Sequence, residues 1–358
     1  MSFLGIRSKE YQDEKGRDYF FDNAKFILIM FVVIAHFVSP LKTDQDKVMT
    51  VWIVINAFHM PAFIFISGYF AKSYITKDRQ IRVNKLVTYV MYYVFAQIGL
   101  SLYEYYILDR YQIETSMFAP RSSLWYLLCL IWWFVLLPYI TRLKTPVVIG
   151  MAFLFGLLIG YDSAVSNYLA WSRVFSFFPF FIVGYYFKKE WLFKFRNICT
   201  QIAAAIVLVI AVIWTYYNLD DIPRRIITGE YNYEDAHLKY FLHFPFMNRL
   251  IFYIVAFILV YAVLLLVPRG KAFFTKLGSR TLQVYILHRF LYMAELEYGW
   301  WEYSIFDGRR GAFIMAFIAI ATTFILSLKP FEIPFKLIGR INLKKLEKPE
   351  IAEGETKI

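Results

Sequence analysis

Cysteine is scarce in this chain, which contains only two in 358 residues. Cys129 lies inside an apolar run and Cys199 at the edge of another, so we expect neither a disulfide framework nor a cysteine metal site. No cleavage pattern of small residues follows the first apolar segment, so we expect that segment to be retained as a membrane anchor. No internal repeat relates the two halves of the chain.

Apolar residues are abundant instead. Hydrophobic residues make up 59% of the chain and aromatic residues 21%, and the mean hydropathy is +0.48. A soluble core could not absorb so much apolar surface, so the composition predicts a polytopic membrane protein in contact with membrane lipid. The net charge of +12 would suit a nucleic-acid partner, but the basic residues form short clusters between apolar runs, as membrane topology requires. We therefore expect no nucleic-acid partner.

The apolar runs predict an all-α bundle of about ten transmembrane helices. This transmembrane domain covers residues 24–328, between an N-terminal segment 1–23 and a basic tail 329–358. The ninth helix carries four charged or histidine side chains, so we expect it to face the bundle interior. The predicted helices lie near residues 24–41, 49–71, 85–107, 122–141, 145–161, 171–187, 198–217, 249–267, 279–296 and 311–328.

The connecting segments predict the orientation of the bundle. Lysines and arginines number 26 in the segments on the side of the N-terminus and 9 in the segments on the opposite side. Because cytoplasmic segments of membrane proteins are enriched in these residues, both termini are predicted to be cytoplasmic. The longest connection, residues 218–248, is then external.

The first predicted helix contains two ionisable residues, Lys25 and His36. They are eleven positions apart, so at ~100° per residue both side chains lie on one helix face. At ~1.5 Å per residue they are also roughly 16 Å apart along the axis, with Lys25 near a membrane surface and His36 beyond the middle. An ionisable residue at that depth indicates a functional site. The alternative is a lysine that snorkels to the surface and a histidine bonded to a neighbouring helix.

Three of the five histidines are predicted to lie at one depth. His36, His59 and His288 each lie about ten residues, or roughly 15 Å, into their helices. Glu295 shares the helix face of His288 and is placed to restrain it; alternatively, His288 only forms a bond between helices. His59 stands close to Pro61, so its alternative role is to satisfy backbone carbonyls that the proline frees.

Charged residues also gather toward the predicted external side. Arg121 and Arg173 lie at the external ends of the fourth and sixth helices, where they serve either substrate binding or interfacial anchoring. The acidic and histidine residues of the 218–248 loop lack a recognisable metal-ligand spacing, so we expect a solvated loop and no metal. The tyrosines of that loop suit either stacking on sugar rings or the membrane interface. The acidic and histidine residues are Glu230, Glu234, Asp235, His237 and His243.

The first helix and the segments that follow resemble the membrane-bound acyltransferase-3 family. Asp22, Lys25 and His36 match its D-x-x-R/K start with the R/K-x10-H spacing, and FHMPAFIFISGYF at 58–70 is similar to its F-F-x-x-S-G pattern. LWYL at 124–127 and SRVFSFFPFFIVGYY at 172–186 resemble the middle helices of the branch related to fucose O-acetylases. LGSRTLQVYILH at 277–288 resembles the late G-x-x-S/T-L-x-x-Y-x-x-H motif. These segments occur in family order.

The resemblance implies transfer of an acyl group, most often acetyl from acetyl-CoA, to a hydroxyl of a cell-envelope carbohydrate at the bacterial plasma membrane. It implies a donor substrate and no bound cofactor. His36 is then either the general base for the hydroxyl or a relay that carries the acyl group itself. Lys25 would meet the donor's phosphates or thioester, with Asp22 one turn earlier; Asp22 otherwise favours the helix N-terminus. His288 would be a second catalytic or orienting histidine.

A transport function remains the alternative from the residues alone. Polytopic envelope proteins of this size also export or flip lipid-linked saccharides, and intramembrane histidines and arginines suit pyrophosphate binding or proton coupling. The absence of an internal repeat and the ordered motifs favour the acyltransferase.

Overall fold

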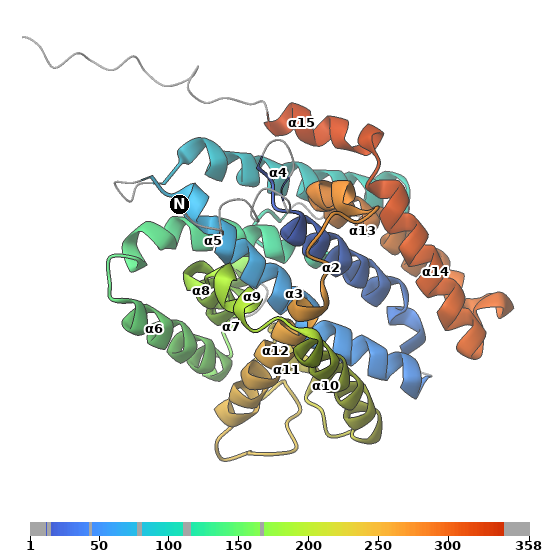
Figure 1. Cartoon of the computed structure of the whole chain (residues 1–358). Helices are drawn as coiled ribbons and strands as arrows, with labels where there is room; N and C mark the ends of the chain where they lie inside the picture. The colour runs from blue at the N-terminus through green and yellow to red at the C-terminus, as the bar shows by residue number, and fades with distance from the viewer. Residues whose placement is uncertain are drawn as a thin grey trace, which may run out of the picture.

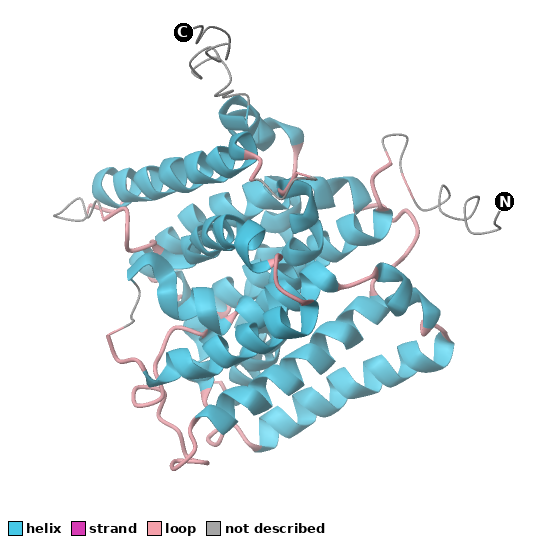
Figure 2. Cartoon of the chain, turned by 90° about the vertical axis from the view of Figure 1, so that its left-hand side faces the viewer, coloured by secondary structure: helices cyan, strands magenta, loops and turns pink. Residues whose placement is uncertain are grey.

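The computed structural model describes residue 12 and residues 16–42, 45–76, 81–109, 116–164 and 168–339. Within these ranges the regular structure is helical, and the β contacts are two isolated bridges (Figure 2). Figure 1 shows α2 and α3 running through the middle of the bundle. The helices are α2 (Tyr19–Phe37), α3 (Asp46–Ala71), α4 (Val83–Tyr106), α5 (Trp125–Ile140), α6 (Thr145–Leu158), α7 (Trp171–Ser176), α8 (Phe178–Tyr186), α9 (Lys189–Lys194), α10 (Ile198–Tyr217), α11 (Arg224–Thr228), α12 (Phe246–Leu266), α13 (Thr281–Tyr298), α14 (Gly308–Leu326) and α15 (Ile333–Gly339).

Among the described residues, seven helical segments are long and apolar enough to cross a membrane. They confirm the prediction of an all-α protein with several candidate membrane spans, whereas the number of ten and the cytoplasmic termini stay predictions. The other three predicted spans are also helical, but α6 is short, α7 and α8 are two pieces, and α13 is more polar. The seven segments are Tyr19–Phe37, Asp46–Tyr74, Val83–Tyr106, Ser122–Ile140, Ile198–Tyr217, Phe246–Leu266 and Gly308–Leu326.

The predicted span at 171–187 is broken between α7 and α8. Pro179 lies in the first turn of α8, and its missing N–H cannot continue the hydrogen-bond ladder of α7. Just before α7, Leu169 and Ala170 have φ angles of 53° and 54°, in the left-handed region that L-residues seldom adopt. The chain therefore turns sharply before α7, the helix is interrupted at Phe177, and neither piece is long enough to span a bilayer alone.

Two glycines bring α3 and α8 into backbone contact. A Cβ added at Gly68 of α3 would lie 2.0 Å from the carbonyl oxygen of Phe181, and one at Gly184 of α8 would lie 2.0 Å from that of Phe65. Only glycine fits at either position. Small residues at such crossings let membrane helices approach closely, which maximises van der Waals contact where water provides no driving force.

The start of α2 is fixed to the segment that leads into α13. The Asn23 side chain donates to the carbonyl oxygens of Pro268 and Gly270, at 2.9 and 2.8 Å, and accepts from the Thr275 hydroxyl at 2.6 Å. Asp18 caps the helix by accepting from the backbone N–H of Phe20. These bonds satisfy a buried amide and fix the register between α2 and α13, the two helices that carry His36 and His288.

The 218–248 loop is anchored to the bundle by Tyr233. Its backbone N–H donates to the Gly160 carbonyl oxygen at 2.7 Å, and its hydroxyl donates to that of Leu157 at 2.7 Å. Burial raises the pKa of Tyr233 to about 12, so this hydroxyl stays protonated at neutral pH. The guanidinium of Arg249 lies 4.9 Å from the ring centroid. This part of the loop is packed rather than solvated, and Tyr233 is not available to stack on a sugar.

Candidate active site

His36 and His288 meet inside the bundle, although α2 and α13 are far apart in the sequence. Their ring centroids are 5.3 Å apart and their planes are inclined by 33°. The ring of Tyr292, one turn beyond His288, lies 5.2 Å from His36. The sequence predicted that these two histidines lie at one depth, and in the structure their rings also lie next to each other.

Arg289 completes this cluster, and the sequence reasoning missed it. Its Nη1 lies 3.1 Å from Nδ1 of His36, and its guanidinium lies 4.4 Å from the ring centroid of Tyr292. Because a guanidinium has donors only, Nδ1 of His36 accepts this hydrogen bond, and the proton of the neutral ring is then on Nε2. Arg289 had appeared only as one of the charges that made the ninth helix unusual; its place next to His288 was the available signal.

Of the three histidines at this depth, only His36 is partly exposed. His288 is completely buried, its Nδ1 lies 2.9 Å from the Val284 carbonyl oxygen, and its Nε2 has no hydrogen-bond partner. His59 is buried as well, and its Nδ1 lies 2.7 Å from the carbonyl oxygen of Ile55, one turn back on α3. His36 is therefore the one histidine of these three with part of its surface exposed.

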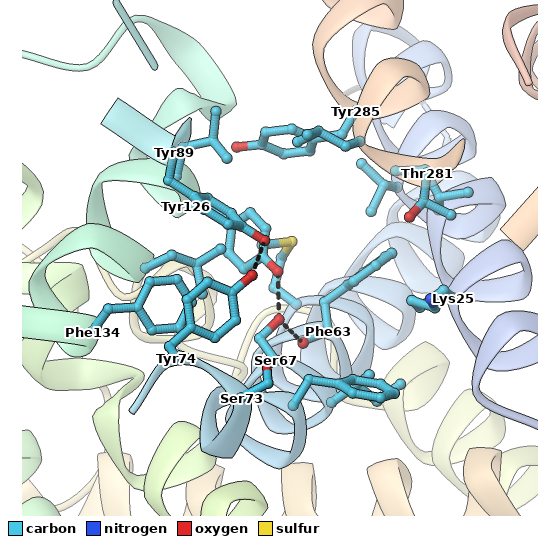
Figure 3. Close-up of a pocket in the computed structure, with 18 residues that line it drawn as sticks. Lys25, Phe63, Ser67, Ser73, Tyr74, Tyr89, Tyr126, Phe134, Thr281 and Tyr285 are labelled. Atoms are coloured by element: carbon cyan, nitrogen blue, oxygen red, sulfur yellow. Dashed lines mark hydrogen bonds between the residues drawn. The ribbon is translucent and has the colours of Figure 1, made fainter. Parts of the chain in front are cut away.

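A cavity of about 350 Å³, the Lys25 pocket, lies next to the histidines. Ser73 and Phe70 on its rim are exposed, whereas Tyr285 and Leu127 at its other end are buried, so the pocket opens beside Lys25. Figure 3 shows Lys25 and Thr281 on one wall and Tyr74, Tyr126 and Phe134 on the other. The lining residues are Lys25, Ile29, Val32, Met60, Phe63, Ile66, Ser67, Phe70, Ser73, Tyr74, Tyr89, Tyr126, Leu127, Leu130, Phe134, Thr281, Leu282 and Tyr285.

The buried end of the Lys25 pocket lies one helical turn from each histidine. Val32 precedes His36 by four residues, Tyr285 precedes His288 by three, and Phe63 follows His59 by four. Residues three or four apart on a helix stack on the same face, about 5.4 Å apart along the axis. The pocket thus ends one helical turn before the cluster, on the face of α2 that Lys25 and His36 share.

Hydroxyl groups line the wall of the Lys25 pocket that faces Lys25. The Ser67 and Tyr126 oxygens are 2.6 Å apart, and the Tyr74 hydroxyl donates to that of Tyr89 at 3.0 Å (Figure 3). Tyr285 donates to the backbone carbonyl of Ser123. Such groups can bond to amide or carbonyl oxygens of a ligand. They interrupt an otherwise aromatic surface formed by rings such as that of Phe134.

Lys25 is held at the pocket by Asp22. Its Nζ lies 2.8 Å from Oδ1 of Asp22, whose carboxylate also accepts from the Arg17 guanidinium at 2.8 and 3.1 Å. Asp22 therefore forms ion pairs in addition to being in the first turn of α2. The lysine side chain is 23% exposed, and it lines the pocket. An ammonium placed there can meet an anionic or carbonyl group that enters from outside the bundle.

The other predicted residues do not join this cluster. Arg121 pairs with Glu104, and Arg173 pairs with Glu230 at 2.6 Å while its guanidinium lies 4.9 Å from the ring of Trp125. Glu295 is completely buried, and neither of its carboxylate oxygens has a hydrogen-bond partner, so it does not restrain His288 by a hydrogen bond. Within the described residues no group of three or more histidine, cysteine or acidic side chains could hold a metal ion.

Comparison with known families gives a match over most of the chain. The family model of the acyltransferase domain matches residues 18–328, which begins at the cap of α2 and ends after α14. Comparison with curated proteins and with solved structures found no match. The matched region contains the Lys25 pocket and the whole histidine cluster. The chain belongs to the acyltransferase-3 family.

Proposed function

We propose that this protein is an integral-membrane O-acyltransferase that moves an acyl group, most simply acetyl, from acyl-CoA to a hydroxyl of a cell-envelope carbohydrate. The observation that carries the proposal is the pocket that begins at Lys25 and ends at Val32 and Tyr285, one helical turn from His36 and His288. A donor and an acceptor on opposite sides of a membrane need such an entry into the bundle. The family match favours this function over export of a lipid-linked saccharide.

The Lys25 pocket suits the donor. Acyl-CoA presents phosphates at one end and a thioester on a slender arm with amide groups at the other. Lys25 at the mouth has the charge for a phosphate, while the hydroxyls of Ser67 and Tyr126 lie along the wall where amide or thioester oxygens would run. The positive balance of the segments on the Lys25 side suggests that this mouth faces the cytoplasm, where acyl-CoA is made.

His36 is the proposed reactive group. As general base, its imidazole takes the proton of the acceptor hydroxyl while that oxygen attacks the thioester carbon, and the proton then passes to the leaving thiolate. As relay, its ring nitrogen attacks the thioester, releases CoA thiol and passes the acyl group to the hydroxyl. Both routes need a ring nitrogen with a free lone pair. The partial exposure of His36 supports either.

The acceptor side is proposed from the family resemblance. The fucose O-acetylase-like motifs, including SRVFSFFPFFIVGYY, favour a sugar hydroxyl as acceptor and a bacterial plasma membrane as the location. Arg173 is a candidate contact, because it pairs with Glu230 of the 218–248 loop, and the neighbouring Gly229 accepts a hydrogen bond from Ser172 at the same end of α7. Arg121 is the corresponding candidate at the start of α5.

Transfer by the purified protein tests the proposed function. The protein in lipid nanodiscs is given acetyl-labelled acetyl-CoA together with an envelope-glycan fraction. We expect label in an alkali-labile ester on the carbohydrate and an equal amount of free CoA thiol. If folded protein neither releases CoA thiol nor labels any glycan, the proposed acyl transfer is wrong, and export of a lipid-linked saccharide becomes the favoured function.

A further inference from the structure

Arg289 is a buried cation that lacks an anionic partner. Its side chain is 3% exposed, and its Nε has no hydrogen-bond partner. Within the described chain no acidic side chain pairs with it, and the buried Glu295 of the same helix is unpaired as well. Arg121 and Arg173, by contrast, each have a carboxylate. A guanidinium left uncompensated in a membrane interior is costly, and such groups face a ligand or a functional cavity.

Arg289 also occupies the lone pair that the proposed chemistry needs. In neutral His36, Nε2 carries the proton when Nδ1 accepts from Arg289, so Nδ1 is the only basic or nucleophilic nitrogen of the ring. An acceptor hydroxyl or a thioester can use that nitrogen only after the guanidinium moves away. The contact thus describes the empty enzyme, and Arg289 needs another acceptor when substrates are bound.

We propose that Arg289 is a catalytic residue that caps Nδ1 of His36 in the empty enzyme and moves to the carbonyl oxygen of the acyl donor, where it stabilises the tetrahedral oxyanion. This inference rests on the proposed acyl transfer. The acyl oxygen reacts next to Nδ1, within reach of a guanidinium that now lies 3.1 Å from that nitrogen. Arginine suits both states because it offers five donors from one planar group.

Each bond, electron pair and proton can be followed through the proposed transfer, first with His36 as general base. The acceptor oxygen forms a bond to the thioester carbon, its proton goes to Nδ1, and the carbonyl electron pair moves onto the oxygen that Arg289 holds. When the carbonyl re-forms, the carbon–sulfur bond breaks, and the thiolate takes the proton from His36. In the relay route Nδ1 attacks the thioester carbon first, and the oxyanion forms at the same carbonyl oxygen. The carbon–sulfur bond then breaks, and the thiolate takes the proton from Nε2. When the acceptor oxygen attacks the acyl carbon, its proton returns to Nε2 and the bond between Nδ1 and the acyl group breaks. No oxidant, metal or further reactant is required.

Enzyme kinetics provide the first test. Removal of one oxyanion donor typically lowers kcat by 10²–10³-fold, so Arg289→Met should lower kcat by about 100-fold with little change in KM for acetyl-CoA. Arg289→Lys keeps the charge and should recover part of that loss. Arg309→Met, at an exposed position of α14, should retain normal kinetics. Normal kcat in a folded Arg289→Met protein would overturn the catalytic role.

Chemical modification gives a test that does not depend on turnover. The lone pair of an unprotonated imidazole attacks diethyl pyrocarbonate and becomes carbethoxylated, and mass spectrometry of the His36 peptide measures the rate. With the cap removed, His36 in Arg289→Met should react several-fold faster than in the wild type, while the exposed His243 should react equally in both. Equal rates at His36 would reject the cap. If Arg289→Met does not fold, the same comparison with Arg289→Lys decides, because a faster His36 reaction is again expected.

The two proposals fail in different ways. A wild-type protein that transfers no acyl group rejects the proposed function, whatever the modification rates are. A wild-type protein that transfers acyl groups, with a folded Arg289→Met variant of equal kcat, rejects only the role of Arg289.

Discussion

The imidazoles of His36 and His288 lie with their ring centroids 5.3 Å apart, and of these two residues only His36 is partly exposed. His288 bonds to its own helix and leaves its inner nitrogen, Nε2, without a partner. The two rings thus divide a single site into a reacting group and a buried neighbour. A buried polar atom without a partner is costly, which suggests that substrate or a bound water completes the site.

Substitution of the histidines should separate their roles. His36→Ala removes the base or relay and should lower the transfer rate on the order of 100-fold or more. His288→Ala should cause a smaller loss, because this ring is proposed to act beside the reacting group. His243→Ala, on the exposed loop, is the matched control. Rates are measured as CoA thiol release, with protein yield and monodispersity checked for each variant; a near-normal rate for His36→Ala would remove that residue from the mechanism.

Substitutions at Lys25 test the donor end of the pocket. Lys25→Ala should raise KM for acetyl-CoA or lower the transfer rate without changing which sugar is modified. The carboxylate of Asp22 keeps Arg17 as a partner, so the variant should still fold. Lys25→Arg should keep substantial activity, since the charge remains. Unchanged kinetics in acetyl-CoA combined with a new acceptor preference would assign Lys25 to the sugar instead.

A pair of substitutions at Ser67 tests whether the Lys25 pocket holds the donor. Ser67→Phe places a ring inside the cavity and should raise KM for acetyl-CoA at least tenfold, about 1.4 kcal/mol of binding. Ser67→Ala only removes the hydroxyl that lies 2.6 Å from that of Tyr126, and its effect should be smaller. Binding is measured by titration of each variant with a non-hydrolysable acetyl-CoA analogue. Equal affinity for Ser67→Phe and wild type would place the donor elsewhere.

The crossing of α3 and α8 gives a stability prediction. Gly68→Ala and Gly184→Ala each place a Cβ within 2.0 Å of a facing carbonyl oxygen, so the helices must separate. Overpacking of this kind typically costs about 1–3 kcal/mol, and both variants should show a lower unfolding temperature in detergent. Gly150→Ala is the control, because no atom lies within 4 Å of its added Cβ. If all three variants unfold at the same temperature as the wild type, the backbones of α3 and α8 do not approach as closely as described.

The sequence was most informative where a physical constraint acts along one helix. Hydropathy predicted a helical segment at each of the ten predicted spans, but not the short helices α9, α11 and α15. The spacing of Lys25 and His36 places both on one face of α2, and Lys25 lines the pocket that ends one turn before His36. The sequence pattern did not predict which side chains of different helices contact each other. Nothing in the local pattern indicates that Arg289 reaches His36, because that contact depends on how α2 and α13 pack.

Two other features show the same limit. The sixth span was expected as one helix because its composition is uniformly apolar, but Pro179 divides it, and the effect of a single missing N–H does not appear in a hydropathy average. Tyr233 was read with the tyrosines of a solvated loop. Its burial depends on a gap over Gly160, whose missing side chain leaves room for the ring.

The central claim is that acyl-CoA enters beside Lys25 from the cytoplasmic side and reacts at His36. Supplying the donor to only one side of the membrane tests this claim most directly. Inverted membrane vesicles and intact cells containing the wild-type or the His36→Ala protein are given labelled acetyl-CoA, and ester-linked label in the envelope carbohydrate is measured. The account predicts label in the inverted vesicles with the wild-type protein, little with His36→Ala, and none in intact cells, where the donor cannot reach the mouth beside Lys25. Equal labelling with the two proteins, or labelling only from the outer side, would contradict it.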